Sequence, residues 1–334
     1  MHITYLIGNG FDLSCGLETR YTNVYDKYCY TLSPNDNISE FKKTILKNNY
    51  ENWTDFEMAL PGFGKKLNDF EKFSECILDF TAFLEDYLKE QESMIDINQN
   101  KNTLASKIRD YIYHVDRYCL QASEAALGSM IQRGNEHTIC NFVTFNYTDT
   151  LEKCLSTVSK SIAKNSQYLY QYNNPIHVHG VLYNGILLGL DNEKFYKDIP
   201  CDDARKLRNL IDKVYINSRY SNITNQILKI IKESNIIVIF GWSMGESDSF
   251  WVENVKKIFS GKPDMHLVYV PYYSTAVNKR FRNQSLNRED EQKDFIMKKF
   301  DLSENQRGRV HIVTDTEYMK LDFLAKGNNK LITA

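Results

Sequence analysis

Short apolar runs alternate with longer amphipathic stretches along the 334-residue chain. Strands are expected at residues 3–8 (ITYLIG), 138–145 (TICNFVTF), 175–180 (PIHVHG), 185–189 (GILLG), 235–240 (NIIVIF), 266–270 (HLVYV) and 310–314 (VHIVT). Continuous apolar runs are typical of parallel strands that are buried on both faces. Helices are expected between them, at 148–155 and 221–234. This alternation predicts an α/β fold with a Rossmann-like, doubly wound and mostly parallel sheet.

Residues 36–135 show helical patterns and no convincing strand pattern. Thr54 and Glu57 form a Ser/Thr-x-x-Glu capping box, which predicts a helix that begins at Thr54. A second amphipathic stretch runs from Thr103 to about Gln132. Apolar residues also recur at helical spacing at Phe73, Ile77, Phe80, Leu84, Tyr87 and Leu88. We therefore divide the chain into an α/β core of residues 1–35 and 136–334 and a helical insertion of residues 36–135.

Composition argues against several classes of protein. Lys and Arg total 41 against 43 Asp and Glu, so no overall basic field favours nucleic acid or an acidic membrane. The seven cysteines are scattered without a Cys-x-x-Cys pair, so neither a zinc module nor a disulfide framework is expected. No apolar stretch approaches the ~20 residues of a membrane span, and the first run is too short for a signal peptide. We expect a reduced, cytoplasmic protein.

Four polar or glycine-rich motifs follow four of the expected strands. They are GNGFDLSCG (8–16), TFNYTDTLE (144–152), HVHG (177–180) and GWSMGESD (241–248). In a doubly wound sheet, ligands bind beyond the carboxyl ends of the strands. The four motifs are therefore expected to form one composite site.

The first motif has a functional and a structural interpretation. Gly8 and Gly10 allow a sharp turn that brings backbone amides close to a phosphate group. However, Leu13 stands where the usual dinucleotide fingerprint has its third glycine. Asp12 is equally suited to cap a helix. Taken alone, the motif leaves nucleotide binding and a plain turn equally open.

The other motifs offer the same choice. Asn146 can bind a ribose hydroxyl or position a water, or it can cap the next helix, as Thr148 can. His177 and His179 lie on the same side of a short strand, but no third metal ligand is evident nearby. A general base at His179 is the alternative to a structural histidine. Asp248 can accept from a hydroxyl or cap a helix. The last motif also supplies Gly241 and Ser243 as possible nucleotide contacts.

In order and content, the motifs resemble the sirtuin-type NAD-binding fold. The first is similar to the sirtuin glycine loop at Gly8, Gly10 and Gly16. Asn146 and His179 stand in the places of the sirtuin catalytic asparagine and histidine. More narrowly, the ordered set GNGFDL, Tyr21, NWTDFE, TFNYT, HVHG and GWSMGESD resembles the AbiH family of bacterial abortive-infection proteins.

The chain also departs from the sirtuin pattern. Asp12 and Glu18 replace a serine and a proline, and Thr148 is an extra residue between Asn146 and Asp149. The four zinc cysteines of true sirtuins are missing, so a groove for an acylated peptide is not expected. The helical block occupies that part of the chain, which disfavours a protein deacylase.

The resemblance implies that NAD is the substrate, that no metal is needed and that water is the acceptor. The products would be nicotinamide and ADP-ribose, formed during an abortive response to phage. Catalysis is assigned to Asn146 and His179. Ligand binding is assigned to the neighbouring motif residues Gly8, Asn9, Gly10, Phe11, Asp12, Gly16, Thr144, Asp149, Gly241, Ser243 and Asp248.

Two further alternatives remain open at this point. Asp55 or Glu57 can approach the site from the helical block, although the capping box is the simpler role. The chain can also be a sensor that binds ADP-ribose or another nucleotide without turnover and signals through its helical part. For an enzyme of this kind, a homo-oligomer, a regulatory protein or a phage-derived trigger is expected to control activity.

Overall fold

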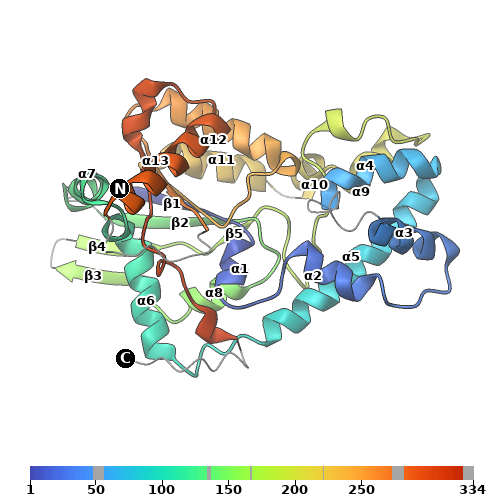
Figure 1. Cartoon of the computed structure of the whole chain (residues 1–334), viewed down its shortest axis with the longest axis horizontal. Coiled ribbons are helices and arrows are strands. Elements are labelled where there is room, and N and C mark those ends of the chain that lie inside the picture. Colours follow the sequence, from blue (N-terminus) through green and yellow to red (C-terminus); the bar gives the residue numbers. More distant parts are fainter. Residues whose placement is uncertain (48–55, 134–136, 166–167, 221, 273–281, 326–334) are drawn as a thin grey trace.

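A computed structural model describes residues 1–47, 56–133, 137–165, 168–220, 222–272 and 282–325. At its centre is an eight-stranded sheet in the order β3-β4-β2-β1-β6-β7-β8, with β5 paired to β2 (Figure 1). The strands are β1 (His2–Ile7), β2 (Thr138–Thr144), β3 (Ser161–Asn165), β4 (Tyr168–Tyr172), β5 (Ile176–His177), β6 (Ile236–Phe240), β7 (His266–Val270) and β8 (Val310–Ile312). Strands β3 and β4 pair antiparallel, and the other described pairs are parallel. The predicted α/β class and mostly parallel sheet are confirmed.

The strand order reverses at β1. The chain continues from β1 to β2 on one side, while β6 lies on the other side. Ile7 pairs with both Thr144 of β2 and Phe240 of β6, so the carboxyl ends of three strands lie level. A reversal of this kind leaves a crevice between the loops that follow the strands.

Helices cover both faces of the sheet. One face packs against α1 (Gly10–Ser14), α6 (Lys101–Tyr113), α7 (Gln121–Arg133) and α8 (Thr150–Leu155). The other face packs against α11 (Ile223–Glu233), α12 (Ser249–Gly261) and α13 (Arg282–Lys299). Because side chains alternate along a strand, Tyr5 and Ile7 of β1 enter the first core and Leu6 enters the second.

A third core lies beside the sheet, on the right in Figure 1. It is formed by α2 (Tyr21–Tyr28), α3 (Asp36–Lys47), α4 (Phe56–Leu67), α5 (Phe70–Ser93) and residues 182–211, which include α9 (Ala204–Ile211). We call this unit the helical layer. Its aromatic side chains pack closely, with the rings of Phe56 and Phe80 stacked at 4.0 Å between centroids. Helix α10 (Lys213–Tyr220) follows it directly.

The helical layer does not follow the predicted boundary of residues 36–135. Helices α6 and α7 of that range pack on the sheet, whereas α2 and residues 182–211 join the helical layer. The expected helix over 103–132 is divided, because a 3₁₀ turn at Val115–Tyr118 separates α6 from α7. Thr54 of the predicted capping box, like Asp55, lies outside the described residues.

Three strand predictions need correction. No strand forms at 185–189, where positive φ angles at Gly185 and Gly189 interrupt the extended backbone and a single bridge joins Gly180 to Ile186. The expected strand over 175–180 is reduced to β5, since Gly180 also has a positive φ of 77°. The sequence did not predict β3 and β4, because residues 161–172 mix polar and apolar side chains and contain no continuous apolar run.

Candidate functional site

The loops after β1 and β6 meet backbone to backbone at the strand-order reversal. The amide of Gly8 donates to the Phe240 carbonyl at 3.0 Å, and that of Gly10 donates to the Gly241 carbonyl at 2.9 Å. A Cβ on Gly10 would lie 2.4 Å from the Gly241 Cα, and Gly241 has a φ of 65°. Both glycines are therefore required by the close approach of the two loops.

This contact corrects one expectation of the sequence. The amides of Gly8 and Gly10 were expected to hold a pyrophosphate, but the β6 loop already occupies them. The α1 helix that follows has only five residues. The two glycine amides thus help to build the wall of a cavity and are not available to a phosphate group. Asn9 fixes this wall, because its side chain exchanges two hydrogen bonds with Thr19, at 2.9 and 2.6 Å.

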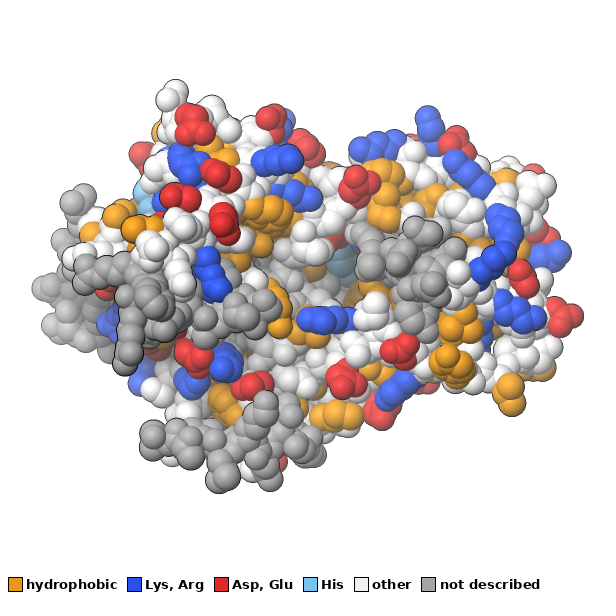
Figure 2. Space-filling model, in the orientation of Figure 1, with side chains coloured by type: hydrophobic (Ala, Val, Ile, Leu, Met, Phe, Trp, Pro, Cys, Tyr) orange, Lys and Arg blue, Asp and Glu red, His pale blue; other side chains and the backbone are white. Residues whose placement is uncertain are grey.

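A cavity of about 740 Å³ opens beyond the strand ends. Figure 2 shows the surface hollowed between the sheet-bearing part and the helical layer, with acidic and basic side chains interspersed around it. Predicted site residues that line the cavity are Gly8, Asn9, Gly10, Asp12, Asn146, His179, Gly241, Ser243 and Asp248. The four motifs that are distant in sequence therefore contribute to one cavity. Glu57 of α4 also lines it, from the helical layer.

Asn146 is held by a buried carboxylate. Its Nδ2 donates to Oδ1 of Asp12 at 3.2 Å, and Thr148 donates to Oδ2 of the same carboxylate at 2.8 Å. This arrangement leaves Oδ1 of Asn146 buried and without a hydrogen-bond partner in the described part of the chain. Burial raises the pKa of Asp12 from 3.8 to about 7, against the opposing effect of its two donors. Asp12 lies inside α1 and orients Asn146, and the N-cap position of α1 is Asn9, so Asp12 does not take the alternative role of a helix cap.

His179 is held in the same way by a second carboxylate. Its Nε2 lies 3.0 Å from Oδ1 of Asp248, and Trp242 donates to Oδ2 of Asp248 at 2.9 Å. The Nδ1 atom of His179 is buried and has no hydrogen-bond partner among the described residues. The rings of Phe145 and Trp242 stack beside this histidine, at 4.3 Å between centroids. Burial and the charge of Lys213 lower the pKa of His179.

A buried lysine joins this carboxylate to the helical layer. Lys213, at the start of α10, is 2% exposed, and its Nζ lies 3.0 Å from Glu57 and 3.3 Å from Asp248. Burial lowers the pKa of Lys213, but the two carboxylates raise it more, so the side chain is charged. Burial likewise raises the pKa of Asp248, yet Lys213 and His179 bring it below the ordinary value. Asp248 is therefore ionised.

Four predicted ligand-binding residues do not line the cavity. Phe11 is fully buried against Phe240, and Thr144 accepts a hydrogen bond from the Asn146 backbone. Gly16 has a φ of 86° and ends α1, where a glycine commonly follows a helix. Asp149 lies at the N-terminal end of α8 and its amide donates to Glu92. These residues support the loops and are placed away from the cavity.

In the part of the chain that it describes, the structure does not join His177 and His179 in a metal cluster but groups His177 with two carboxylates. Asp149, Glu152 and His177 place possible ligand atoms within 4.8 Å of one another. The two ring nitrogens of His177 each lie 2.8 Å from an acceptor, the Asn146 carbonyl and the Glu152 carboxylate. Burial lowers the pKa of His177, but Glu152 raises it further, and the net shift is upward. A charged imidazole satisfies both acceptors, whereas Oε2 of Glu152 is buried and has no hydrogen-bond partner among the described residues.

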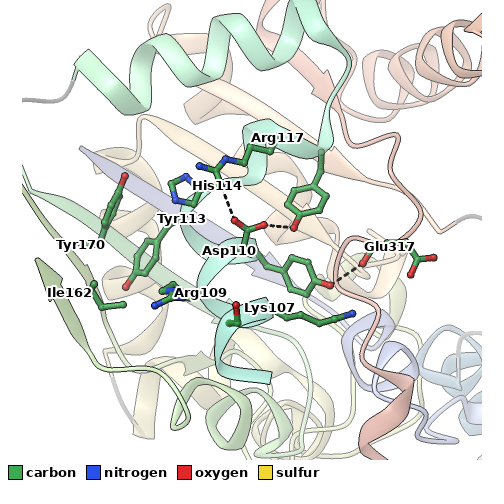
Figure 3. A pocket seen from close by; sticks show the side chains of 12 residues that line it. Lys107, Arg109, Asp110, Tyr113, His114, Arg117, Ile162, Tyr170 and Glu317 are labelled. Carbon is green, nitrogen blue, oxygen red and sulfur yellow. Dashed lines mark hydrogen bonds and ion pairs between the residues drawn. The ribbon is translucent and has the colours of Figure 1, made fainter. Parts of the chain in front are cut away.

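A second cavity, of about 590 Å³, lies beside α6 and contains no predicted site residue. Two of its charged groups pair, since Asp110 accepts from Arg117 at 2.9 Å and also from Tyr118 (Figure 3). The hydroxyl of Tyr111 donates to the Glu317 carbonyl at 3.0 Å. The hydroxyl of Tyr113, which also lines this cavity, is buried and has no hydrogen-bond partner among the described residues.

Sequence reasoning missed several residues of the first cavity. Arg20 and Tyr147 line it, Trp242 holds Asp248, and Lys213 lies behind it. Arg20, Tyr147 and Trp242 stand within or just after the motifs, so their position was an available signal. No sequence signal identified Lys213, because a single lysine in a helical stretch is normally exposed.

A model of the bacteriophage abortive infection AbiH family matches residues 4–269. The chain therefore belongs to this family, and its role lies in phage abortive infection. No curated protein matches the chain. Within the described residues, no helix is both long enough and apolar enough to cross a membrane.

Proposed function

We propose that this AbiH-family protein hydrolyses NAD to nicotinamide and ADP-ribose and so removes NAD from an infected cell. One observation carries the proposal: Oδ1 of Asn146 and Nδ1 of His179 are buried acceptors without partners among the described residues, and both residues line the same cavity. A buried polar group without a partner costs about 1–3 kcal/mol, so such a pair calls for a ligand that donates hydrogen bonds. Ribose hydroxyls and an attacking water are donors of this kind.

The chemistry suits these two atoms. Cleavage of the bond between ribose and nicotinamide develops positive charge on the ribose, as in other glycosidic cleavages. Asn146 would accept from a ribose hydroxyl or from the water and hold it in place. His179 would take a proton at Nδ1 as the water attacks, because its lowered pKa keeps the ring neutral near pH 7. Arg20 is a cation at the cavity for the phosphate groups, which the engaged glycine amides cannot hold.

The resting conformation bears on control of the reaction. Both acceptors are closed off from solvent, so a water reaches them only after the cavity changes shape. We expect a trigger, a regulatory protein or assembly of copies of the chain to cause that change. A sensor that retains ADP-ribose without turnover is the competing function, and the same closed site is compatible with it.

Nicotinamide release from NAD by the purified protein, followed by chromatography with and without phage lysate, tests the proposal. Asn146→Ala and His179→Ala should each lower the rate by ~10²-fold or more, the usual scale for a positioned acid–base group. Asn102→Ala, which alters an exposed residue of α6 that does not line the cavity, is the matched control, and its rate of nicotinamide release should stay within a few-fold of wild type. Bound nucleotide without nicotinamide release under all conditions would instead establish the sensor.

A further inference from the structure

Three charged residues from three parts of the chain meet beneath His179. Glu57 comes from α4 of the helical layer, Lys213 from the start of α10, and Asp248 from the loop after β6. Oε1 of Glu57 also accepts from the Gly189 amide at 3.0 Å, which fixes its orientation. The side chains of Glu57, Lys213 and Asp248 are 8%, 2% and 11% exposed. Buried charges of this kind are retained only when they are paired.

We infer that Lys213 and Glu57 are positioning residues for the proposed reaction: they hold Asp248 as a carboxylate against Nε2 of His179, so Nδ1 is the base. The inference rests on the proposed function, which names His179 as the base. It goes further by assigning the nitrogen and by placing part of the control of catalysis in the helical layer.

The hydrogen bonds around Asp248 determine which ring nitrogen of His179 carries the proton. Its Oδ1 faces Nζ of Lys213 and Nε2 of His179, and its Oδ2 accepts from Nε1 of Trp242. Two of these partners, the lysine and the tryptophan, can only donate. An ionised carboxylate satisfies all three, provided that the histidine carries its proton on Nε2. The neutral ring then has its lone pair on Nδ1, the atom that has no partner in the part of the chain that the structure describes.

Lys213 is needed to keep this arrangement. Without Lys213, the buried carboxylates of Glu57 and Asp248 would have no cation beside them. One of these carboxylates or His179 would then bind a proton. If that proton settles on His179, both ring nitrogens are protonated and the base is lost. Glu57 has the complementary task of holding Lys213 in place, since its Oε2 is the nearer carboxylate oxygen.

Other ionisable groups also face this cluster. They are Tyr147 and Asp191 around Lys213, and His177 near His179. Asp191 is occupied by the Ser249 hydroxyl and the Phe250 amide, and it does not contact His179 directly. Among the described residues, Lys213 is thus the cation that contacts the carboxylate of Asp248.

The test compares Lys213→Met with the charge-balanced double variant Lys213→Met/Glu57→Gln. Removing the cation should raise the pKa of His179, so the acid limb of kcat/KM should move to higher pH by about one unit, with kcat reduced up to ~10-fold at the acid end of that limb and KM nearly unchanged. The double variant restores the net charge of the cluster and should return the limb toward that of wild type. Lys206→Met removes an exposed lysine and should change neither quantity.

Nitrogen NMR of the histidine rings gives a readout that does not need turnover. The signals of His179 are identified by their loss in His179→Gln, and wild type should show a proton on Nε2 and none on Nδ1. If wild type releases no nicotinamide but shows this tautomer, the proposed function fails and the positioning role stands. A proton on Nδ1 in wild type, or an unchanged tautomer and pH profile in folded Lys213→Met, would overturn the inference. Should Lys213→Met not fold, the double variant and the wild-type tautomer still decide it.

Discussion

The substitution Asp12→Asn separates the role of this carboxylate in stability from its role in orienting Asn146. Asp12 is 2% exposed, and burial raises its pKa from 3.8 to about 7. The folded protein therefore favours the protonated form, and the stabilisation that this gives is lost as the pH rises through about 7. Between pH 5 and about pH 7 the unfolded chain has Asp12 ionised while the folded protein keeps it protonated. Over these roughly two pH units the free energy of unfolding of wild type falls by about 3 kcal/mol, and it falls little further up to pH 8.

Asn at position 12 cannot ionise, so the stability of the variant does not fall in this way as the pH rises. Urea unfolding at pH 5 and pH 8 should show the free energy of unfolding of the variant, relative to wild type, rising by about 3 kcal/mol at the higher pH. Asp322→Asn removes an exposed carboxylate and should stay within about 0.5 kcal/mol of wild type at both. If the difference in unfolding free energy between Asp12→Asn and wild type is the same at pH 5 and pH 8 within about 1 kcal/mol, burial does not raise the pKa of Asp12 as described.

The same variant should lose activity while it gains stability at pH 8. Asp12 accepts from two donors, Asn146 and Thr148, whereas an amide has only one acceptor oxygen. Asn146 can compensate for the missing acceptor by rotating its side-chain amide by about 180°, which would present its NH₂ group to the cavity in place of Oδ1. Nicotinamide release should then fall ~10²-fold, as expected when a positioned acceptor is lost. A variant with wild-type activity would show that Asn146 does not depend on Asp12.

Two further predictions concern the strand ends and the opposite edge of the sheet. Gly10→Ala should destabilise the protein by about 1–3 kcal/mol in urea unfolding, because its Cβ would lie 2.4 Å from the Gly241 Cα. Gly62→Ala in α4, where a Cβ meets nothing within 4 Å, is the control and should be neutral or stabilising. Burial lowers the pKa of His311 to about 3, so its stabilising contribution is present above pH 6.5 and is lost as the pH falls. Wild type should therefore lose about 2 kcal/mol more than His311→Gln between pH 7 and pH 5, and equal losses would contradict the assignment.

The sheet was readable from the sequence because its central strands are continuously apolar. Residues 3–8, 138–145 and 235–240 correspond closely to β1, β2 and β6, and the motifs after them line one cavity. The local sequence pattern gave a wrong prediction where tertiary packing determines the backbone conformation. Segment 185–189 is apolar but contains two glycines with positive φ, and it serves the helical layer rather than the sheet.

The candidate site was only partly predictable for the same reason. Residue type indicated Asn146 and His179 as acceptors, but not the carboxylates that orient them. Of the described partners of these carboxylates, only Trp242, six positions from Asp248, is local. The partners of Asp12 lie 134 and 136 positions away, and Lys213 and His179 lie 35 and 69 positions from Asp248. No spacing rule reaches so far along a chain. Gly8 and Gly10 were recognised correctly as essential to a turn, yet their amides face another loop, which only the fold could show.

The pairing of Glu57 with Lys213 has a consequence for the synthesis of the protein. These two residues are 156 positions apart, and Asp248 lies 35 positions further on. Contacts between distant positions form late, because the intervening chain must first be ordered. A chain still emerging from the ribosome carries Asp12, Asn146 and His179 well before it carries Asp248. The cavity can therefore be completed only after most of the protein has been made, and a translation product that stops before residue 248 lacks the carboxylate that holds His179.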